Sequence, residues 1–284
     1  MHALPFIVLL FTTALFAAQP IHSSLSLYTE DMSFTNSKQK TDGRVYGLGA
    51  DLHHDAHEFR FATEYAKTNT IRPQLKEDLQ THKLFASYGY ALTPALTLKA
   101  HALHVPKDNI APTAYGTSYG AGIDYKFTKK ADISLKQFFS EYRDFDVAQS
   151  DITLNKKFAL GAFRFKLSLL SHYITMHSYK DNAFSKNAQN TYLSGALKLH
   201  AHYDKYHFGA AAYTGERLFA VMADGFKIQH HAMEFDRTYA LGTGINIDNY
   251  VLRLQYIYQR AEEIPMKNEN VKVQNIRVVF NYKL

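Results

Sequence analysis

The sequence contains no cysteine and no tryptophan. Without cysteine there is no disulfide framework, no thiolate metal site and no thiol nucleophile, which excludes disulfide-rich scaffolds and cysteine-dependent enzymes. Beyond the first twenty residues there is also no apolar run of about 20 residues, so no membrane-crossing helix is predicted. A search for long apolar runs does not detect a membrane β-barrel, because only every second residue of its strands faces lipid.

Acidic residues are fewer than basic ones, with 26 Asp and Glu against 32 Lys and Arg, for a formal net charge of +6. The basic residues are spread singly rather than gathered in a helix or stripe, so nucleic acid is not a predicted partner. Tyr and Phe number 20 each. This aromatic content is typical of a β-rich core or of strands with aromatic membrane-interface girdles, and composition leaves both open.

Residues 1–18 consist of an apolar core from Phe6 to Phe16 followed by Ala17 and Ala18. An apolar segment of about this length before small residues is typical of a secretory signal peptide. We therefore expect cleavage after Ala17 or Ala18 and a mature domain over residues 19–284 in a non-cytoplasmic compartment. The alternative is a buried N-terminal element of a cytosolic protein.

The rest of the chain alternates apolar and polar residues with a period of two. In residues 115–127, one face carries Tyr115, Tyr119, Ile123 and Phe127, and the other carries Gly, Ser, Asp and Lys. A strand separates such sets, whereas a helix would scatter both around its circumference. The same alternation occurs over 57–67, 81–92, 95–105, 162–175, 191–203, 238–248, 250–259 and 275–284. The segment near 25–34 is the least regular, and its register is expected to shift.

Short turns alternate with long polar connections along the chain. Six short turns and seven longer connections join about fourteen predicted strands, and twelve or sixteen strands fit the same organisation. The longer connections are near 36–42, 68–78, 106–114, 143–150, 179–190, 218–234 and 261–272. Tight turns at one end and long loops at the other are typical of membrane β-barrels.

A soluble antiparallel sandwich also alternates apolar and polar residues. The predicted strands are longer than the ~5–6 residues usual in soluble sheets. Their polar face is rich in Gly, Ser and Lys, which makes a poor second core. The predicted fold is therefore an all-β, transmembrane, antiparallel up-and-down β-barrel, with the apolar faces toward lipid.

The ending from Ile276 to Leu284, Ile-Arg-Val-Val-Phe-Asn-Tyr-Lys-Leu, resembles the C-terminal assembly signal of bacterial outer-membrane barrels. Together with the signal-like start and the strand count, the chain resembles small monomeric porins of Gram-negative outer membranes. The family most often ends in Phe, and Leu284 departs from that pattern. The resemblance implies a channel for passive diffusion of small hydrophilic solutes, surrounded by outer-membrane lipid and lipopolysaccharide. It also implies recognition of the C-terminal strand by the assembly machinery, and it favours a monomer.

If the apolar faces meet lipid, the opposite faces line the lumen. This parity directs many basic side chains inward and few acids, namely Glu64, Asp124 and Asp248. The pore-lining candidates are Arg60, Lys83, Lys99, Lys126, Lys136, Arg164, Lys166, Lys198, Arg253 and Arg277, and the same parity places Lys157 and Lys283 inward. Fixed positive charge in a narrow aqueous pore lowers the energy of anions, so anion preference is a hypothesis. The alternative is that many of these lysines are solvated near the periplasmic turns.

The connection over 218–234 is long and partly apolar. Its candidate pore-constricting residues are Phe219, Met222, Phe226, His230 and His231. Apolar side chains are unfavourable in water. The segment is therefore expected either to fold into the pore or to lie in the outer headgroup region.

The sequence gives weaker indications of other functions. The 15 histidines include adjacent pairs, but a metal site needs three or four converging ligands, so no metal and no cofactor is predicted. An outer-membrane lipid hydrolase would need Ser, His and an orienting partner in contact. Ser168 and His172 share inward parity but lie too far apart for a direct pair, so no enzyme is predicted. A structural or adhesive barrel with a closed lumen remains the alternative to a channel, although inward glycines such as Gly120 and Gly242 favour open space.

Overall fold

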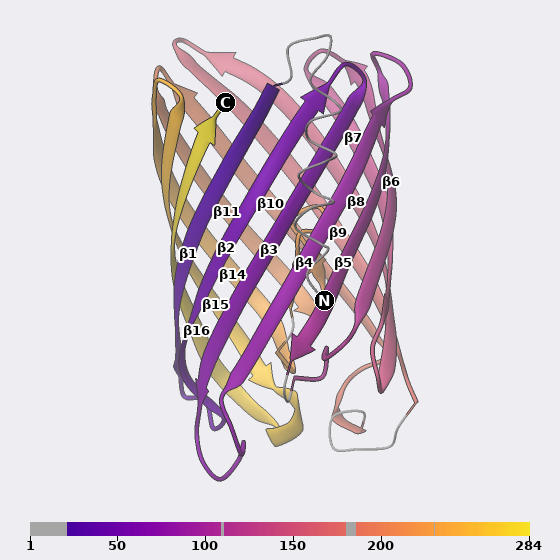
Figure 1. Ribbon diagram of the computed structural model, residues 1–284, viewed down its shortest axis with the longest axis vertical. Coiled ribbons are helices and arrows are strands. Elements are labelled where there is room, and N and C mark those ends of the chain that lie inside the picture. The colour runs from indigo at the N-terminus through magenta and orange to yellow at the C-terminus, as the bar shows by residue number, and fades with distance from the viewer. Residues whose placement is uncertain (1–21, 109–110, 180–185, 230) are drawn as a thin grey trace, which may run out of the picture.

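The computed structural model describes residues 22–108, 111–179, 186–229 and 231–284. These residues form a tall barrel of tilted strands (Figure 1). None of the helical segments within the described ranges is long and apolar enough to cross a membrane. The predicted signal peptide, residues 1–18, lies outside the described residues.

Long antiparallel strands follow one another along the chain. In order they are β1 (His22–Thr35), β2 (Lys40–His54), β3 (His57–Thr70), β4 (Leu79–Ala91), β5 (Leu96–Asp108), β6 (Thr117–Thr128), β7 (Ala131–Glu141), β8 (Phe145–Leu160), β9 (Phe163–Ser178), β10 (Thr191–Tyr203), β11 (Tyr206–Arg217), β14 (Met233–Ile247), β15 (Tyr250–Glu263) and β16 (Asn268–Lys283). Two short strands, β12 (Val221–Met222) and β13 (Lys227–Ile228), form a separate two-stranded sheet that is not part of the barrel wall. η1 (Ile264–Met266) is a single 3-10 turn.

The sheet closes because β1 pairs with β16, from Ser24 opposite Lys283 to Thr35 opposite Lys272. The barrel order contains fourteen strands, so the predicted strand number and fold class are confirmed. The six predicted short turns lie at one end, the upper end in Figure 1, where the C-terminus also lies. The connections predicted to be long lie at the other end, but those over 36–39 and 142–144 are only four and three residues long, because β2 begins at Lys40 and β8 at Phe145.

The outer face is apolar along the strands. Leu193 and Leu241 are 63% and 64% exposed, and leucine, isoleucine and tyrosine are exposed on most neighbouring strands. Next to the short turns, outward aromatic rings pack in pairs, with ring centroids 4.8 Å apart for Phe163–Tyr203 and 5.0 Å for Tyr250–Tyr282. An exposed apolar band edged by aromatic rings is the surface that a lipid bilayer covers.

The inner face changes character along the barrel axis. Toward the long loops its side chains are apolar and form two buried clusters. The larger cluster includes Phe85, Leu103, Val105, Phe138, Phe145, Val147, Ile174, Met176 and Tyr192 of the wall. The smaller includes Met32, Phe34, Val45, Ala66, Met233, Phe235, Ala261, Val271 and Val273. The lumen is thus filled at the loop end and polar toward the short turns.

The inner clusters correct the prediction for the first strand. β1 keeps one register from end to end, and its exposure alternates regularly, so the expected register shift is wrong. Met32 and Phe34 face inward, where they pack in the smaller cluster. The apparent irregularity arises because apolar residues occupy both faces at this end of the strand. The predicted loop over 261–272 is also shorter than expected, since β15 and β16 extend to Glu263 and from Asn268.

Candidate functional site: the barrel lumen

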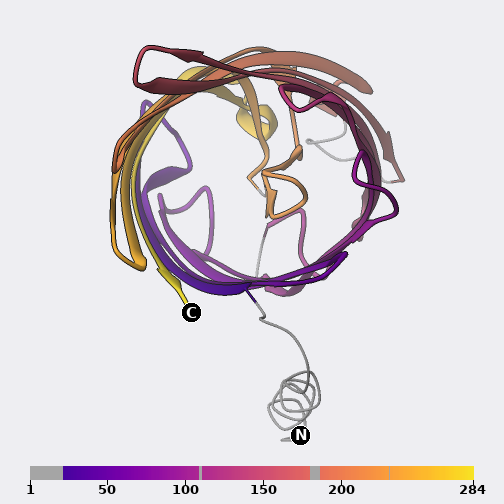
Figure 2. The ribbon, with the colours of Figure 1, turned by 90° about the horizontal axis from the view of Figure 1, so that it is seen from above.

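The segment between β11 and β14, residues 218–232, is called the lumen loop below. Its β12–β13 hairpin lies inside the ring of strands when the barrel is viewed from the short-turn end (Figure 2, orange). Phe219 is fully buried in the larger apolar cluster, and Met222 and Phe226 pack against that cluster. His231 packs its ring edge-on against Phe34 at 5.6 Å. Of the five loop candidates, only His230 lies outside the described residues.

One side of the lumen loop is held by β8. The Gln149 side-chain amide donates to the Val221 carbonyl at 2.7 Å, and its oxygen accepts from the Val221 backbone N–H at 2.8 Å. Gln149 is 1% exposed. Its amide also donates to Asp151 at 2.8 Å, and Asp151 in turn contacts the His172 imidazole at 2.7 Å. Two matched hydrogen bonds to one residue fix both the position and the direction of the loop backbone there.

The other side of the lumen loop reaches β1. The Lys227 ammonium donates to the Glu30 carboxylate at 3.5 Å. Glu30 is fully buried and also accepts from Asn275 at 2.6 Å and from the Arg277 Nε at 2.7 Å. A buried carboxylate is tolerated only when it is paired and hydrogen-bonded. Lys227 of the loop therefore adds a third partner to the buried Glu30 carboxylate, which the wall alone would pair only with Asn275 and Arg277.

These two anchor points lie on opposite sides of the barrel. In the barrel order, seven steps lead from β1 to β8 through β2–β7, and seven lead there through β16, β15, β14, β11, β10 and β9. A loop attached to both strands must cross the full width of the lumen. The predicted inward insertion of this segment, rather than a place among outer headgroups, is the arrangement that the structure shows.

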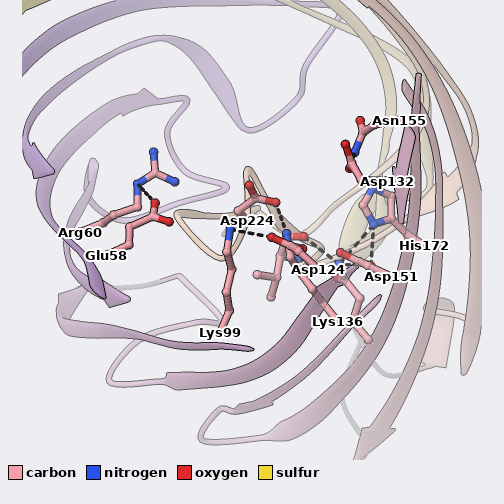
Figure 3. Close-up of polar contacts among 12 residues, drawn as sticks. Glu58, Arg60, Lys99, Asp124, Asp132, Lys136, Asp151, Asn155, His172 and Asp224 are labelled. Carbon is pink, nitrogen blue, oxygen red and sulfur yellow. Dashed lines mark hydrogen bonds and ion pairs between the residues drawn. The ribbon is translucent and has the colours of Figure 1, made fainter. Parts of the chain in front are cut away.

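The turn between β12 and β13 carries Asp224 into the polar part of the lumen, where it forms an ion pair with Lys136 of β7 (Figure 3). Burial alone raises the pKa of Asp224, but the cations Lys136, Lys99 and Arg60 outweigh it and lower the pKa to about 2. Gly225 follows with φ of +91°, and a side chain there would also press on His101. Asp224 is thus a third contact between the loop and the wall.

The inner wall pairs many of its predicted pore-lining cations with acids. The nitrogen–oxygen distances are 2.7 Å for Arg60–Asp51, 2.7 Å for Lys83–Glu64 and 2.9 Å for Lys99–Asp124, and Lys136 and Arg277 pair with Asp224 and Glu30. The expectation that few acids face inward is wrong, since Glu30, Asp51 and Asp151 join those predicted. Glu30 has the same parity as Tyr28 on β1, and this shared parity could have placed its carboxylate on the inner wall. The apolar residues beside Glu30 obscured the alternation of the strand.

The remaining pore-lining candidates form no ion pair with an acid within the part of the chain that the structure describes. They are Lys126, Arg164, Lys166, Lys198 and Arg253, and all have inward parity. Three of them, Lys126, Lys166 and Lys198, line a chamber of about 440 Å³ beneath the lumen loop, together with Lys99, Lys136 and His200. The loop contributes Val221, Ala223 and Asp224 to the same chamber. Glu58, Asp124, Asp132 and Asp151 of the wall line it too, so the chamber is polar and carries charges of both signs.

The two residues considered for a hydrolase, Ser168 and His172, do not pair with each other. The Ser168 hydroxyl donates to Asn155 at 2.6 Å rather than to His172. The strand register instead places Ser194 opposite His172, with Asp151 on the other side of that histidine. His172 and Ser194 are each 2% exposed, and the His172 Nε2 and Ser194 Oγ have no hydrogen-bond partner. Neither is accessible to a substrate. Across the described ranges, no three potential metal ligands come together.

No protein-family model and no curated protein matches this sequence. Solved structures do match over nearly the whole chain. The CymD monoaromatic hydrocarbon channel matches with a TM-score of 0.55 and 9% identity, covering 94% of this chain and 88% of that one. A bacterial polysaccharide outer membrane secretin matches with a TM-score of 0.55 and 5% identity, covering 92% and 98%.

The chain has the fold of a bacterial outer-membrane β-barrel. Pseudomonas aeruginosa OccK11 (OpdR) is a further match, with a TM-score of 0.46, 10% identity and coverage of 93% and 96%. These identities are low, so the likeness concerns the fold of this outer-membrane barrel. Its solute has to be argued from the lumen.

Proposed function

We propose that the protein is an outer-membrane channel through which small hydrophilic solutes diffuse passively, narrowed by the lumen loop. The observation that carries this proposal is the polar, water-exposed inner wall below the loop. Charged side chains such as Lys126, Arg164 and Arg253 are exposed although they point into the barrel. A protein interior without water does not keep isolated charges.

The lumen loop supports a narrow rather than a wide pore. It reaches β8 through Gln149 and β1 through Lys227, so it divides the cross-section that solutes must pass. Its apolar residues are buried against the wall rather than in the path, and its polar turn carries Asp224 toward the chamber. Solutes would pass beside a charged, well-anchored constriction.

Anion preference is part of the proposal. In the chamber, Asp224 and Asp124 neutralise Lys136 and Lys99, whereas Lys166 and Lys198 keep their charge without an acid partner. A pair of charges ~4 Å apart is worth ~1 kcal/mol in water and several times more near low-dielectric walls. Five carboxylates and five lysines line the chamber as a whole, so the proposed preference rests on the side of Lys166 and Lys198, whose charges would favour anions by that mechanism.

A closed structural barrel is the second candidate. The observation in its favour is the packing of the lumen loop, whose Phe219, Ala220 and Val221 are at most 1% exposed. A loop held this firmly is compatible with a plug. The two candidates differ in whether the purified protein conducts ions.

The test is planar-bilayer recording of the refolded protein in a KCl gradient. We expect discrete conductance steps and a reversal potential of the sign that chloride permeation sets. Cation preference would overturn the anion proposal, and the absence of any conductance from folded protein would favour the closed barrel. Heat-modifiable migration on gels confirms that the barrel is folded in either case.

The surroundings follow from the fold and the resemblance. The apolar outer band requires a lipid environment. We propose the outer membrane of a Gram-negative bacterium, with lipopolysaccharide in its outer leaflet, and recognition of β16 by the assembly machinery. The 2.9 Å bond from the Leu284 N–H to the Ser23 carbonyl shows that the last residue takes part in barrel closure. Truncation of Leu284 followed by an assembly assay tests that role.

A further inference from the structure

The inner wall is electrically uneven around the barrel. From β1 through β7, the inward cations Arg60, Lys83, Lys99 and Lys136 each pair with an acid, and Lys126 on β6 does not. On β9, β10 and β15, no acid pairs with the inward lysines and arginines in the ranges described, although His172 on β9 contacts Asp151 at 2.7 Å. The basic patch, as it is called below, consists of those lysines and arginines and two neighbouring histidines, namely Arg164, Lys166, Lys198, His200, His202 and Arg253.

The strand register gathers the basic patch into one area. Lys166 lies directly opposite His200, and Arg164 lies directly opposite His202. Directly opposed residues have Cβ atoms ~4.5–5.5 Å apart, and next-but-one residues on a strand lie ~7 Å apart on the same face. Four basic side chains therefore share a stretch of wall that a single small solute can touch. Arg253 lies in the same row of the inner wall as His202, three strands away through His207 and Gly244.

Between β10 and β15, glycines occupy three inward positions beside the basic patch. The register continues from His200 to Gly209 and Gly242, and from His202 through His207 to Gly244 and Arg253. A Cβ added at Gly209 would lie 3.6 Å from the His200 ring, one at Gly242 would lie 3.3 Å from the Gln255 side chain, and one at Gly244 would lie 2.9 Å from the Arg253 side chain. These glycines, called the glycine floor below, therefore let the His200 and Arg253 side chains lie close against the wall.

The basic patch is open to water. Arg164, His200, His202 and Arg253 are exposed, and Lys166, Lys198 and His200 line the chamber under the lumen loop. The lysine and arginine cations of the patch attract any anion, but a single negative charge engages only one or two of them. An anion with several charged oxygens engages more at once, and guanidinium groups bind such oxygens in pairs.

We propose that the basic patch is a binding site for small multivalent oxyanions, namely solutes that carry a phosphate or two or more carboxylates. This inference rests on the proposed channel function and names the solute class for the same lumen. Anions bind at this site as they diffuse through the pore, rather than being attracted only by the average electrostatic potential of the lumen. Flux of such anions therefore saturates with concentration, whereas flux of chloride does not.

The experiment adds inorganic phosphate or citrate to one side of a bilayer that contains the channel in KCl. Each probe is expected to reduce the chloride current with a saturable concentration dependence, and acetate is expected to leave it unchanged. The two probes separate phosphate recognition from polycarboxylate recognition. The double variant Lys166→Gln, Lys198→Gln is expected to raise the half-blocking concentration by about tenfold or more, since two close charges are lost.

The matched control is Lys38→Gln, Lys283→Gln, which removes the same charge from exposed lysines that lie outside the basic patch and do not line the chamber. It is expected to shift the half-blocking concentration by less than about twofold at physiological ionic strength, because screening weakens distant charges. Equal shifts in both double variants, or no saturable block in the wild type, would overturn the site. Arg253→Gln is an independent variant should the first fail to fold.

The failure of the channel and the failure of the site are distinguishable. If folded wild-type protein does not conduct at all, the proposed function fails. Isothermal titration of the detergent-solubilised barrel with inorganic phosphate and citrate then tests the basic patch directly. Binding that the Lys166→Gln, Lys198→Gln variant lacks would retain the site, and no binding would reject it.

Discussion

Replacing Gln149 with leucine is expected to loosen the lumen loop without unfolding the barrel. Gln149 lies on the inner face of β8, so the barrel's own backbone ladder does not depend on its side chain. The side chain makes both of its loop contacts to the backbone of Val221, at 2.7 and 2.8 Å. Leucine has a similar volume but leaves that N–H and carbonyl without partners.

The size of the effect follows from these two bonds. Leaving a buried polar group unsatisfied costs about 1–3 kcal/mol, so two such groups cost about 2–6 kcal/mol together. That range raises the undocked fraction of the loop about 30- to 20,000-fold, at 1.4 kcal/mol per factor of ten. Burial of Phe219 and Val221 still favours the docked state, so the loop is expected to detach briefly rather than permanently.

The assays are single-channel recording and limited proteolysis. Brief excursions to a higher conductance level are expected in the variant, together with faster tryptic cleavage after Lys227, which is held near Glu30 in the docked loop. The control is Gln255→Leu, which removes an inward glutamine on β15 that makes no hydrogen bond to the described part of the loop. Identical noise and identical cleavage rates in both variants and the wild type would refute the anchoring role of Gln149.

Three further predictions address the membrane face, the loop turn and the inner packing. Leu241→Arg, at the middle of β14 on the outer face, is expected to destabilise the barrel in liposomes by about 2–4 kcal/mol in a urea titration, while inward Ala240→Arg costs less. Because its neighbours lower the pKa of Asp224 from 3.8 to about 2, its carboxylate stabilises docking fully above its ordinary pKa and loses this contribution as the pH falls from there through about 2. Gating is therefore expected to be unchanged from pH 7 to pH 4, and a transition in that range that Asp224→Asn abolishes would contradict this. Gly47→Ala is expected to cost about 1–3 kcal/mol, since its methyl group would overlap the Tyr28 ring, and a neutral result in the same titration would refute that packing.

The sequence predicts the barrel well because lipid imposes one simple rule on every strand. Leu193, Leu241 and Ile276 had to face outward, and their alternation fixes the inward parity of all residues between them. The rule that apolar residues face outward fails where apolar side chains fill the lumen. Met32 and Phe34 are apolar and inward because a loop covers them, and no local pattern reveals that cover.

The lumen residues show the same limit in electrostatic terms. Parity correctly placed Arg60, Lys99 and Arg277 on the inner wall, but their charge state depends on partners from other strands. Glu30 lies far from Arg277 in the sequence and meets it only because β1 and β16 close the barrel. Asp224 belongs to a loop whose path no periodicity describes. A count of inward lysines therefore overstates the positive charge that a solute meets.

The pairing pattern and the path of the loop together imply a direction for solutes across the lumen. The lumen loop touches β8 and β1, and its turn places Asp224 beside Lys136 on β7. That side of the chamber is close to neutral. The basic residues without acid partners, Lys166 and Lys198, lie on β9 and β10, and the glycine floor begins beyond them on β11 and β14. An anion is thus drawn to the side where the wall carries lysines without acid partners. The same asymmetry predicts that charge removal on β9 and β10 alters anion flux more than equal removal on β3 or β5, where an acid would be left unpaired instead.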